Sequence, residues 1–287
     1  MPMHSPPGGR AELGQNFLRD PHAIARTIDL VHSTPGSILE IGAGDGALTL
    51  PLSRLARPLR AIEIDPARAQ ALRRRAPHID VVAADGLQVP LDRPTLVSNV
   101  PFHLTTPLLR RILHSGTWTH AVLVLQWEVA RKRAGVGGRT MMTAQTDPWF
   151  SFSLEGRIPS HAFTPRPGVD AGLLRIQRRT APLVPFAERG AYSAFVRRVF
   201  TGRGRTMMRL IANAAPGSSP QAVGDALARA GVPSSALPRD LRPAQWADIW
   251  RAAARLDGTR TRRSSGTRSL DRSHGAREDG AVDGGQR

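Results

Sequence analysis

The fold of this 287-residue chain is decided by the stretch Ser-Ile-Leu-Glu-Ile-Gly-Ala-Gly-Asp-Gly, residues 37–46. Its first five residues, Ser37–Ile41, are mostly apolar and predict a short buried strand. Three glycines at alternate positions then permit a tight turn into a helix expected over Ala47–Leu55, and they let main-chain N–H groups approach a ligand. The spacing is Gly-x-Gly-x-Gly, which differs from the Gly-x-Gly-x-x-Gly of dinucleotide-binding sheets.

Strands and helices alternate outward from this stretch. The expected strands are apolar runs, namely Leu59–Ile64, Ile79–Ala83, Pro94–Ser98 and Ala121–Leu125, closed by Ser151–Leu154 and Gly172–Ile176. The expected helices are Pro66–Arg75, Thr105–His114 and Trp127–Arg133, preceded by a helix that begins at Pro21 behind the N-cap Asp20. This alternation predicts an α/β fold with a parallel sheet covered by helices on both faces.

The pattern changes after a linker over Pro182–Pro185. Four expected helices follow, separated by Gly and Pro: Arg189–Thr201, Thr206–Ala214, Ser219–Ala230 and Pro243–Leu256. We therefore predict four segments, namely a flexible N-terminus over residues 1–12, an α/β domain over 13–182, an all-helical domain over 183–256 and a disordered tail over 257–287. The tail is assigned because it contains almost no apolar residue.

Charge points to the class of partner. The chain carries 40 basic and 23 acidic side chains, a formal net charge of +17. Residues 1–182 account for +8, residues 183–256 for +7 and the tail for +2, so the helical domain is the most basic per residue. This excess favours a polyanion, nucleic acid ahead of a membrane surface. Lys132 is the only lysine, and so general a preference for arginine is typical of genome base composition.

Composition also excludes several classes. With no cysteine, the chain can form neither disulfides nor thiolate sites, and its nine histidines are scattered, so we predict no metal. There is no apolar run of about 18 residues and no secretory signal, which predicts a soluble cytoplasmic protein. A short-chain dehydrogenase needs Tyr and Lys four residues apart, whereas the only candidates are Tyr192 and Lys132.

Acidic residues end the next two expected strands. Glu63, 21 residues past Gly42, can accept both hydroxyls of a ribose, and Asp85, just before Gly86, can meet the amino group of an adenine. Since the carboxyl ends of parallel strands meet at one edge, these residues predict a crevice for an adenosyl ligand. Asp65 is an alternative to Glu63, although it also fits an N-cap of the following helix.

The motif Asn99-Val100-Pro101-Phe102 ends the fourth expected strand. The exocyclic nitrogen of adenine is a poor nucleophile, because its lone pair is delocalised into the ring. An Asn oxygen and a neighbouring main-chain carbonyl can orient its two N–H groups, proline keeps that carbonyl rigid, and the aromatic ring can stack on an extruded base. Alone, the motif would be a strand-end turn; together with the crevice, it indicates chemistry on an adenine.

These motifs, in this order, resemble the rRNA adenine N6-methyltransferases, and among them the erythromycin-resistance (Erm) methyltransferases of actinobacteria. The resemblance spans about residues 10–256 and rests on Gly14–Leu18, Glu40–Thr49, Glu63–Asp65, Asp85, Asn99–Phe102 and Phe163–Asp170. The Erm branch is favoured by Gln126–Gly138 and Val169–Leu174. Val100 and Phe102 agree with it, since housekeeping small-subunit dimethyltransferases usually carry Asn-Leu-Pro-Tyr there.

The resemblance implies a Rossmann-like class I methyltransferase sheet, S-adenosyl-L-methionine as cofactor and a monomer that methylates 23S rRNA, giving resistance to macrolides, lincosamides and streptogramin B. The implied cofactor residues are Gln15, Asn16, Leu18, Gly42, Gly44, Glu63, Asp85, Gly86 and Asn99. The implied catalytic residues are Asn99, Val100, Pro101, Phe102 and Phe163. Phe102 would stack on the flipped adenine and Phe163 would pack from another side, with core packing as the alternative for Phe163.

Arginines are expected to hold RNA phosphates. The candidates are Arg131, Arg133, Arg139, Arg197, Arg198, Arg203, Arg205 and Arg209, with a merely solvated face as the alternative. Two other functions stay open: a housekeeping 16S rRNA dimethyltransferase, and a non-catalytic RNA-binding factor, against which the intact Asn99–Phe102 motif argues. For the tail, an RNA-binding arm is the alternative to simple disorder.

Overall fold

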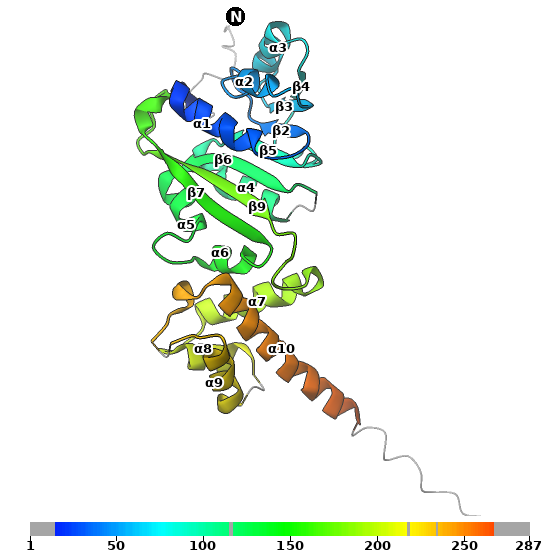
Figure 1. Ribbon diagram of the computed structural model, residues 1–287, viewed down its shortest axis with the longest axis vertical. Coiled ribbons are helices and arrows are strands. Elements are labelled where there is room, and N and C mark those ends of the chain that lie inside the picture. The colour runs from blue at the N-terminus through cyan, green and yellow to red at the C-terminus, as the bar shows by residue number, and fades with distance from the viewer. Residues whose placement is uncertain (1–14, 115–116, 217–218, 234, 267–287) are drawn as a thin grey trace, which may run out of the picture.

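The computed structural model describes residues 15–114, 117–216, 219–233 and 235–266. The chain forms two parts stacked along its long axis, an α/β part that contains the sheet and a helical part that follows it (Figure 1). The predictions for residues 1–12 and for 267–287 lie outside the described residues.

A seven-stranded sheet forms the α/β part, in the order β4-β3-β2-β5-β6-β9-β7. Its strands are β2 (Ile38–Ile41), β3 (Leu59–Glu63), β4 (Asp80–Ala83), β5 (Thr95–Asn99), β6 (His120–Gln126), β7 (Phe150–Ile158) and β9 (Ala171–Arg178). Strand β9 is antiparallel to both of its neighbours, β6 and β7, and the other strands of this sheet share one direction. The predicted α/β class is confirmed, and the strand order reverses between β2 and β5, where open sheets of this kind bind ligands.

Six helices accompany the described strands of this part: α1 (Pro21–His32), α2 (Thr49–Ser53), α3 (Pro66–Arg75), α4 (Thr105–His114), α5 (Trp127–Arg133) and α6 (Met141–Thr146). Asp20 caps α1 as predicted, since its carboxylate accepts a hydrogen bond from the Ala23 N–H at 2.7 Å. The helix α2 is shorter than predicted because turns replace both of its ends, and α6 was not predicted.

Alternate residues of the strands feed two hydrophobic cores. Ile38 and Val122 pack with α1, α2 and α3 on one side of the sheet, whereas Leu39 and Leu123 pack with α4 on the other. The second core does not end at the sheet, because it continues into the helical part through buried aromatic rings such as Tyr192. The two parts therefore share this second core, whereas the first core belongs to the α/β part alone.

The helical part contains α7 (Arg189–Thr201), α8 (Met207–Ala214), α9 (Pro220–Arg229) and α10 (Pro243–Gly266). The sequence predicts that the last helix ends at Leu256, but it continues to Gly266. Once a helix is nucleated, each further residue adds a hydrogen bond at little cost, so an apolar face is not needed for this extension.

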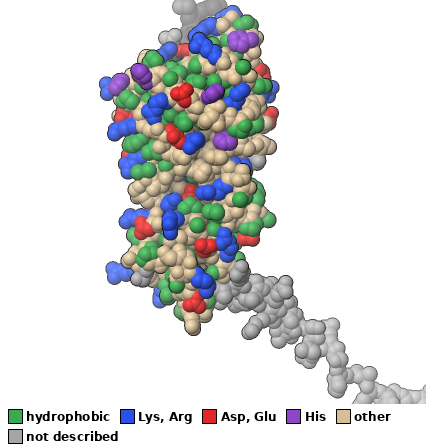
Figure 2. All heavy atoms as spheres, in the orientation of Figure 1, with side chains coloured by type: hydrophobic (Ala, Val, Ile, Leu, Met, Phe, Trp, Pro, Cys, Tyr) green, Lys and Arg blue, Asp and Glu red, His purple; other side chains and the backbone are tan. Residues whose placement is uncertain are grey.

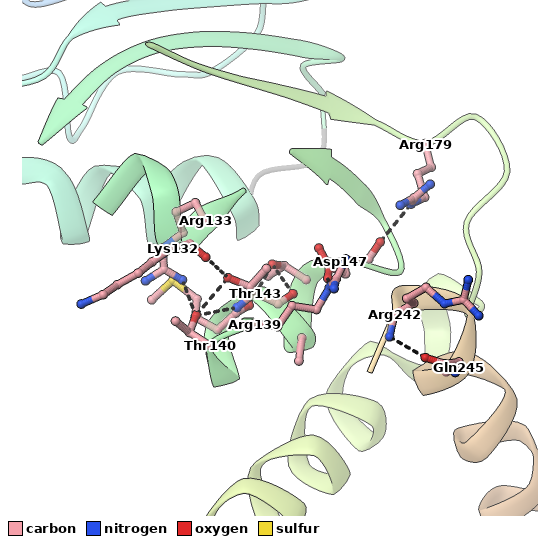
Figure 3. Close-up of polar contacts among 12 residues, drawn as sticks. Lys132, Arg133, Arg139, Thr140, Thr143, Asp147, Arg179, Arg242 and Gln245 are labelled. Carbon is pink, nitrogen blue, oxygen red and sulfur yellow. Dashed lines mark hydrogen bonds and ion pairs between the residues drawn. The ribbon is translucent and has the colours of Figure 1, made fainter. Parts of the chain in front are cut away.

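The two parts meet beside a set of polar residues, among them Arg139 and Asp147 of the α/β part and Gln245 of the helical part (Figure 3). The buried carboxylate of Asp147 accepts a hydrogen bond from Arg139 Nε at 2.7 Å, while the Arg139 N–H donates to the Arg239 carbonyl of the helical part at 2.8 Å. The Tyr192 hydroxyl donates to the Ala144 carbonyl at 2.9 Å. These bonds, added to the shared core, fix the helical part relative to the sheet.

Candidate active site

Two adjoining cavities open at the carboxyl ends of β2, β3 and β5. They contain about 560 and 820 Å³ of empty volume, and both are lined by Gln15, Gly42, Glu63 and Pro101. The walls of the two cavities together include all nine predicted cofactor residues: Gln15, Asn16, Leu18, Gly42, Gly44, Glu63, Asp85, Gly86 and Asn99.

Glycines shape the floor of this crevice. Gly42 has φ +79°, in the left-handed region, and an added Cβ there would meet no atom within 4 Å, so this turn presents bare backbone to open space. Gly86 is needed for a different reason, because a Cβ would lie 2.4 Å from the Ile41 side chain. A side chain at either position would narrow or distort the crevice.

Glu63 is held rigidly at the end of β3, where it is only 2% exposed. One carboxylate oxygen accepts the Gly44 N–H at 2.6 Å and the other accepts the Asp65 N–H at 2.9 Å. Each oxygen keeps a further lone pair, which suits the two adjacent hydroxyls of a ribose. Asp65 itself caps α3 by accepting from the Ala67 N–H at 2.8 Å, which confirms the alternative left open for that residue.

Asn99 is oriented by the segment that precedes α1. Its Nδ2 donates to the main-chain carbonyl of Asn16 at 2.9 Å. Because a carbonyl can only accept, this contact fixes the amide and leaves Oδ1 free to accept from a substrate. The segment is anchored in turn by β1 (Phe17–Leu18), which pairs antiparallel with β8 (Phe163–Thr164). Three motifs far apart in the sequence thus meet at one edge.

The other predicted catalytic residues differ in how far they are buried. Val100 is buried, and its N–H donates to the Val124 carbonyl of β6 at 3.0 Å, which fixes the peptide group between Asn99 and Val100. Phe102 is half-buried and opens a short 3-10 helix at the mouth of the crevice. Phe163 is only 3% exposed and packs in the core, so its ring performs the packing role given as its alternative; contact with a target base stays a prediction.

Glu40 was quoted in the motif but was not assigned a role, and the structure places it in the crevice. It lines the same cavity as Asn16 and Asn99, is 1% exposed, and its Oε2 has no hydrogen-bond partner. Burial raises the pKa of this carboxyl group to about 8. The signal in the sequence is a lone acid within an otherwise apolar strand, Ile-Leu-Glu-Ile.

The eight candidate arginines fall into two groups. Four have partners within the chain: Arg131 with Glu128, Arg133 with Thr140, Arg139 with Asp147, and Arg198 with the Ala214 carbonyl. The side chains of the other four are exposed in the helical part: Arg197, Arg203, Arg205 and Arg209. Figure 2 shows basic side chains spread over both parts of one face, with few acidic ones among them.

Metal-ligand clusters and membrane-spanning helices are both absent from the described residues. Within residues 15–114, 117–216, 219–233 and 235–266, no three His, Asp or Glu side chains come together as metal ligands could. No helix in that part of the chain has the length and apolar character needed to cross a membrane.

The doubly wound sheet, its glycine turn, Glu63 and the Asn99–Phe102 motif at one edge define a methyltransferase that acts on an amino group. The sequence profile described as "Ribosomal RNA adenine dimethylase" matches residues 8–255, and the chain belongs to this family.

Individual relatives agree with this assignment. Over 248 residues the chain is 46% identical to the mycinamicin-resistance protein MyrB of Micromonospora griseorubida, covering 85% of this chain and 79% of the relative. It is 49% identical over 201 residues to an rRNA adenine N-6-methyltransferase of Corynebacterium diphtheriae, covering 69% and 79%. The crystal structure of the 23S rRNA methyltransferase ErmE superposes with a TM-score of 0.74 at 34% identity, covering 84% of this chain and 100% of that one. The resemblance inferred from the motifs is confirmed.

Proposed function

We propose that this protein methylates N6 of one adenosine in 23S rRNA and thereby confers resistance to macrolides, lincosamides and streptogramin B. The observation that carries the chemistry is Asn99, whose amide is fixed by the Asn16 carbonyl at the rim of the crevice. The choice of 23S rRNA and of resistance is supported by the similarity to MyrB and to ErmE.

The crevice fits S-adenosyl-L-methionine on the chemistry of its acids. The unpartnered Oε2 of buried Glu40 suits the ammonium of the methionine part, near Asn16 and Leu18. Glu63 suits the ribose hydroxyls, and Asp85, in the adjoining cavity, suits the amino group of the adenine ring. When bound, the cofactor supplies an electrophilic methyl group on a sulfonium.

The chain's own residues orient the nucleophile. Asn99 Oδ1 accepts one N–H of the target amino group, and the Val100 carbonyl, held rigid between the Val124 bond and Pro101, accepts the other. Phe102 stacks on the extruded base, which replaces part of the stacking lost on flipping. The reaction needs no general base, since the methylated ammonium loses a proton readily to water.

Expression in a macrolide-sensitive bacterium tests the proposed function. We expect resistance to all three antibiotic classes and a primer-extension stop at one adenosine of 23S rRNA. A stop confined to 16S rRNA, with sensitivity retained, would instead support the housekeeping alternative.

The Asn99→Ala variant tests the role of Asn99 in this reaction. It should lower kcat by roughly 10²- to 10³-fold, the usual effect of removing one preorganised hydrogen-bonding group, while the cofactor still binds. Asn213→Ala is the matched control, because the Asn213 amide also donates to a main-chain carbonyl, that of Arg203, but in the helical part. Full activity of Asn99→Ala would refute the role of Asn99.

A further inference from the structure

A second concave surface lies beside the active site, where β6 and β7 end and β9 begins. It contains about 750 Å³ of empty volume and is lined by Gln126, Trp127, Glu128, Arg157, Gly168, Val169 and Asp170. Asn99 of β5 pairs with Val124 of β6, and Trp127 follows three residues later. Strand spacing and rise therefore put the backbones of Asn99 and Trp127 about 10 Å apart, on the same edge of the sheet.

Three segments contribute the residues of this surface, which we call the Trp127–Arg157 shelf. The Trp127 ring rests on Gly172, where a Cβ would lie only 3.2 Å from it. Arg157 stands opposite Gly172 on β7, and its guanidinium carbon lies 5.3 Å from the centroid of the Trp127 ring. Asp170 holds the guanidinium through Nε at 2.7 Å and is itself fixed by the Ser160 N–H at 2.8 Å. The cation is thus held over the ring.

The charges around the shelf are paired, which bears on its ligand. The Ser160 N–H and then Arg157 hold the pKa of the Asp170 carboxyl group below its usual range, so that group stays ionised beside its partner. Glu128 is paired with Arg131 at 3.1 Å. A phosphate would have to compete with these carboxylates for the same cations. A neutral, planar ligand would not have to displace either carboxylate from its cation.

The exposed groups suit a nucleobase. The Arg157 side chain remains 60% exposed despite its ion pair, and Val169 beside it is 51% exposed. A guanidinium is planar and weakly hydrated, and it stacks on flat rings, as bases do in single-stranded RNA sites. The amide of Gln126 at the same rim can pair with the polar edge of any base.

We propose that the Trp127–Arg157 shelf stacks the base of a nucleotide next to the target adenosine. This proposal rests on the proposed function, and it adds that the shelf binds a nucleotide that flanks the methylated adenosine. Extruding the target costs it the stacking with its neighbours. A neighbour stacked on the shelf recovers part of that cost and holds the strand while the target lies over Asn99.

Methylation kinetics on short RNAs test this. The substrates are a transcript that spans the mapped adenosine and two copies in which the 5′ or the 3′ neighbour is replaced by an abasic site. Arg157→Lys keeps the positive charge but removes the planar guanidinium group. Trp127→Leu keeps an apolar side chain but removes the aromatic ring. Arg60→Lys is the matched control, since Arg60 Nε also meets an aspartate, Asp80, at 2.7 Å, but at the amino ends of β3 and β4, on the opposite edge of the sheet from the active site.

On intact RNA, both shelf variants should raise the KM for RNA by about 5- to 20-fold, the effect of one lost base stack, with kcat and the KM for the cofactor unchanged. Arg60→Lys should match the wild type. One abasic RNA should raise the wild-type KM by a similar factor, and the shelf variants should lose nothing further on it, because the two changes remove the same contact.

Two results would overturn the shelf while leaving the proposed function intact: an unchanged KM in both variants, or losses that multiply on both abasic RNAs. Failure of the wild type to methylate the intact transcript and whole 23S rRNA would remove the proposed function itself. Circular dichroism of each variant separates a lost contact from a lost fold, and a variant that unfolds is replaced by Arg157→Gln, which changes only an exposed side chain.

Discussion

Glu40 shows how much a single carboxyl group depends on its surroundings. Its position in the glycine-rich motif could be predicted, but its protonation could not, because that depends on desolvation by the folded protein. Burial raises its pKa from 4.5 to about 8, so at neutral pH the free protein holds it mostly protonated. An ammonium group at Oε2 would favour the ionised form, so cofactor binding should release a proton.

The same shift gives a prediction about stability. Between pH 4.5 and 8 the folded protein binds more protons at Glu40 than the unfolded chain does, so this group makes stability fall as pH rises. Glu40→Gln cannot titrate. The free energy of unfolding of the wild type, relative to the variant, should therefore fall with pH by up to about 1.4 kcal/mol per unit.

Urea unfolding of both proteins at pH 5.5, 6.5 and 7.5 measures this difference. The contribution of Asp147, whose pKa burial raises to about 6, has the same sign in both proteins and cancels. Parallel curves for wild type and variant would show that the pKa of Glu40 is not raised.

At the scale of elements, the sequence predicts those helices and strands that are long enough to show a periodic pattern of apolar residues. The strand expected over Pro94–Ser98 is found at Thr95–Asn99, and the helix expected over Pro66–Arg75 has those bounds. The pair β1 and β8 was not predicted, because two residues carry no periodicity and each strand needs its partner across the chain. The cofactor residues were predictable as a group since strand ends meet at one edge. The shelf was not, because Arg157 and Trp127 meet only through the register of β7 and β9.

The segment between α5 and α6 shows a different limit. Its basic residues indicated RNA contacts, but Arg139 forms a partly buried pair with Asp147 inside the α/β part (Figure 3), next to its main-chain bond to Arg239 of the helical part. Asp147 is eight residues away in sequence, which is too far for two side chains of one helix or one strand to form an ion pair. The sequence does not show which arginine side chains are exposed. It therefore cannot distinguish an arginine that stabilises the fold from one that can contact a ligand.

This pair can be tested by stability. Arg139→Ala leaves a buried carboxylate without its cation and should lower the free energy of unfolding by about 2–4 kcal/mol, somewhat less than for a fully buried pair. Arg131→Ala is the control, because its pair with Glu128 is solvent-exposed and should be worth less than about 1 kcal/mol. Denaturant unfolding at pH 7.5 compares them. Equal losses would mean that the Arg139–Asp147 pair contributes no more to stability than an exposed pair.

At the scale of the whole molecule, the net charge and the shared core act together. Of the +17, residues 1–256 carry +15, and the arginines of the helical part stand on elements packed into the same core as the sheet. RNA phosphates bound there would be held at a set distance from Asn99, because both parts pack into that core. Under the proposed function, the helical part would guide the strand and lower the entropic cost of placing one adenosine.

The exposed arginines of the helical part provide the last prediction. Replacing Arg203 and Arg205 by Gln should weaken RNA binding and reduce the slope of log K against log salt by about 1.4, or 0.7 for each lost phosphate contact on single-stranded RNA. The matched control is Arg54→Gln with Arg74→Gln, two exposed arginines beside α2 and α3 at the far end of the sheet (Figure 1). Both double variants lose two charges. Equal salt slopes would therefore show that only net charge matters, whereas a smaller slope in the helical-part variant alone locates the phosphate contacts on that part.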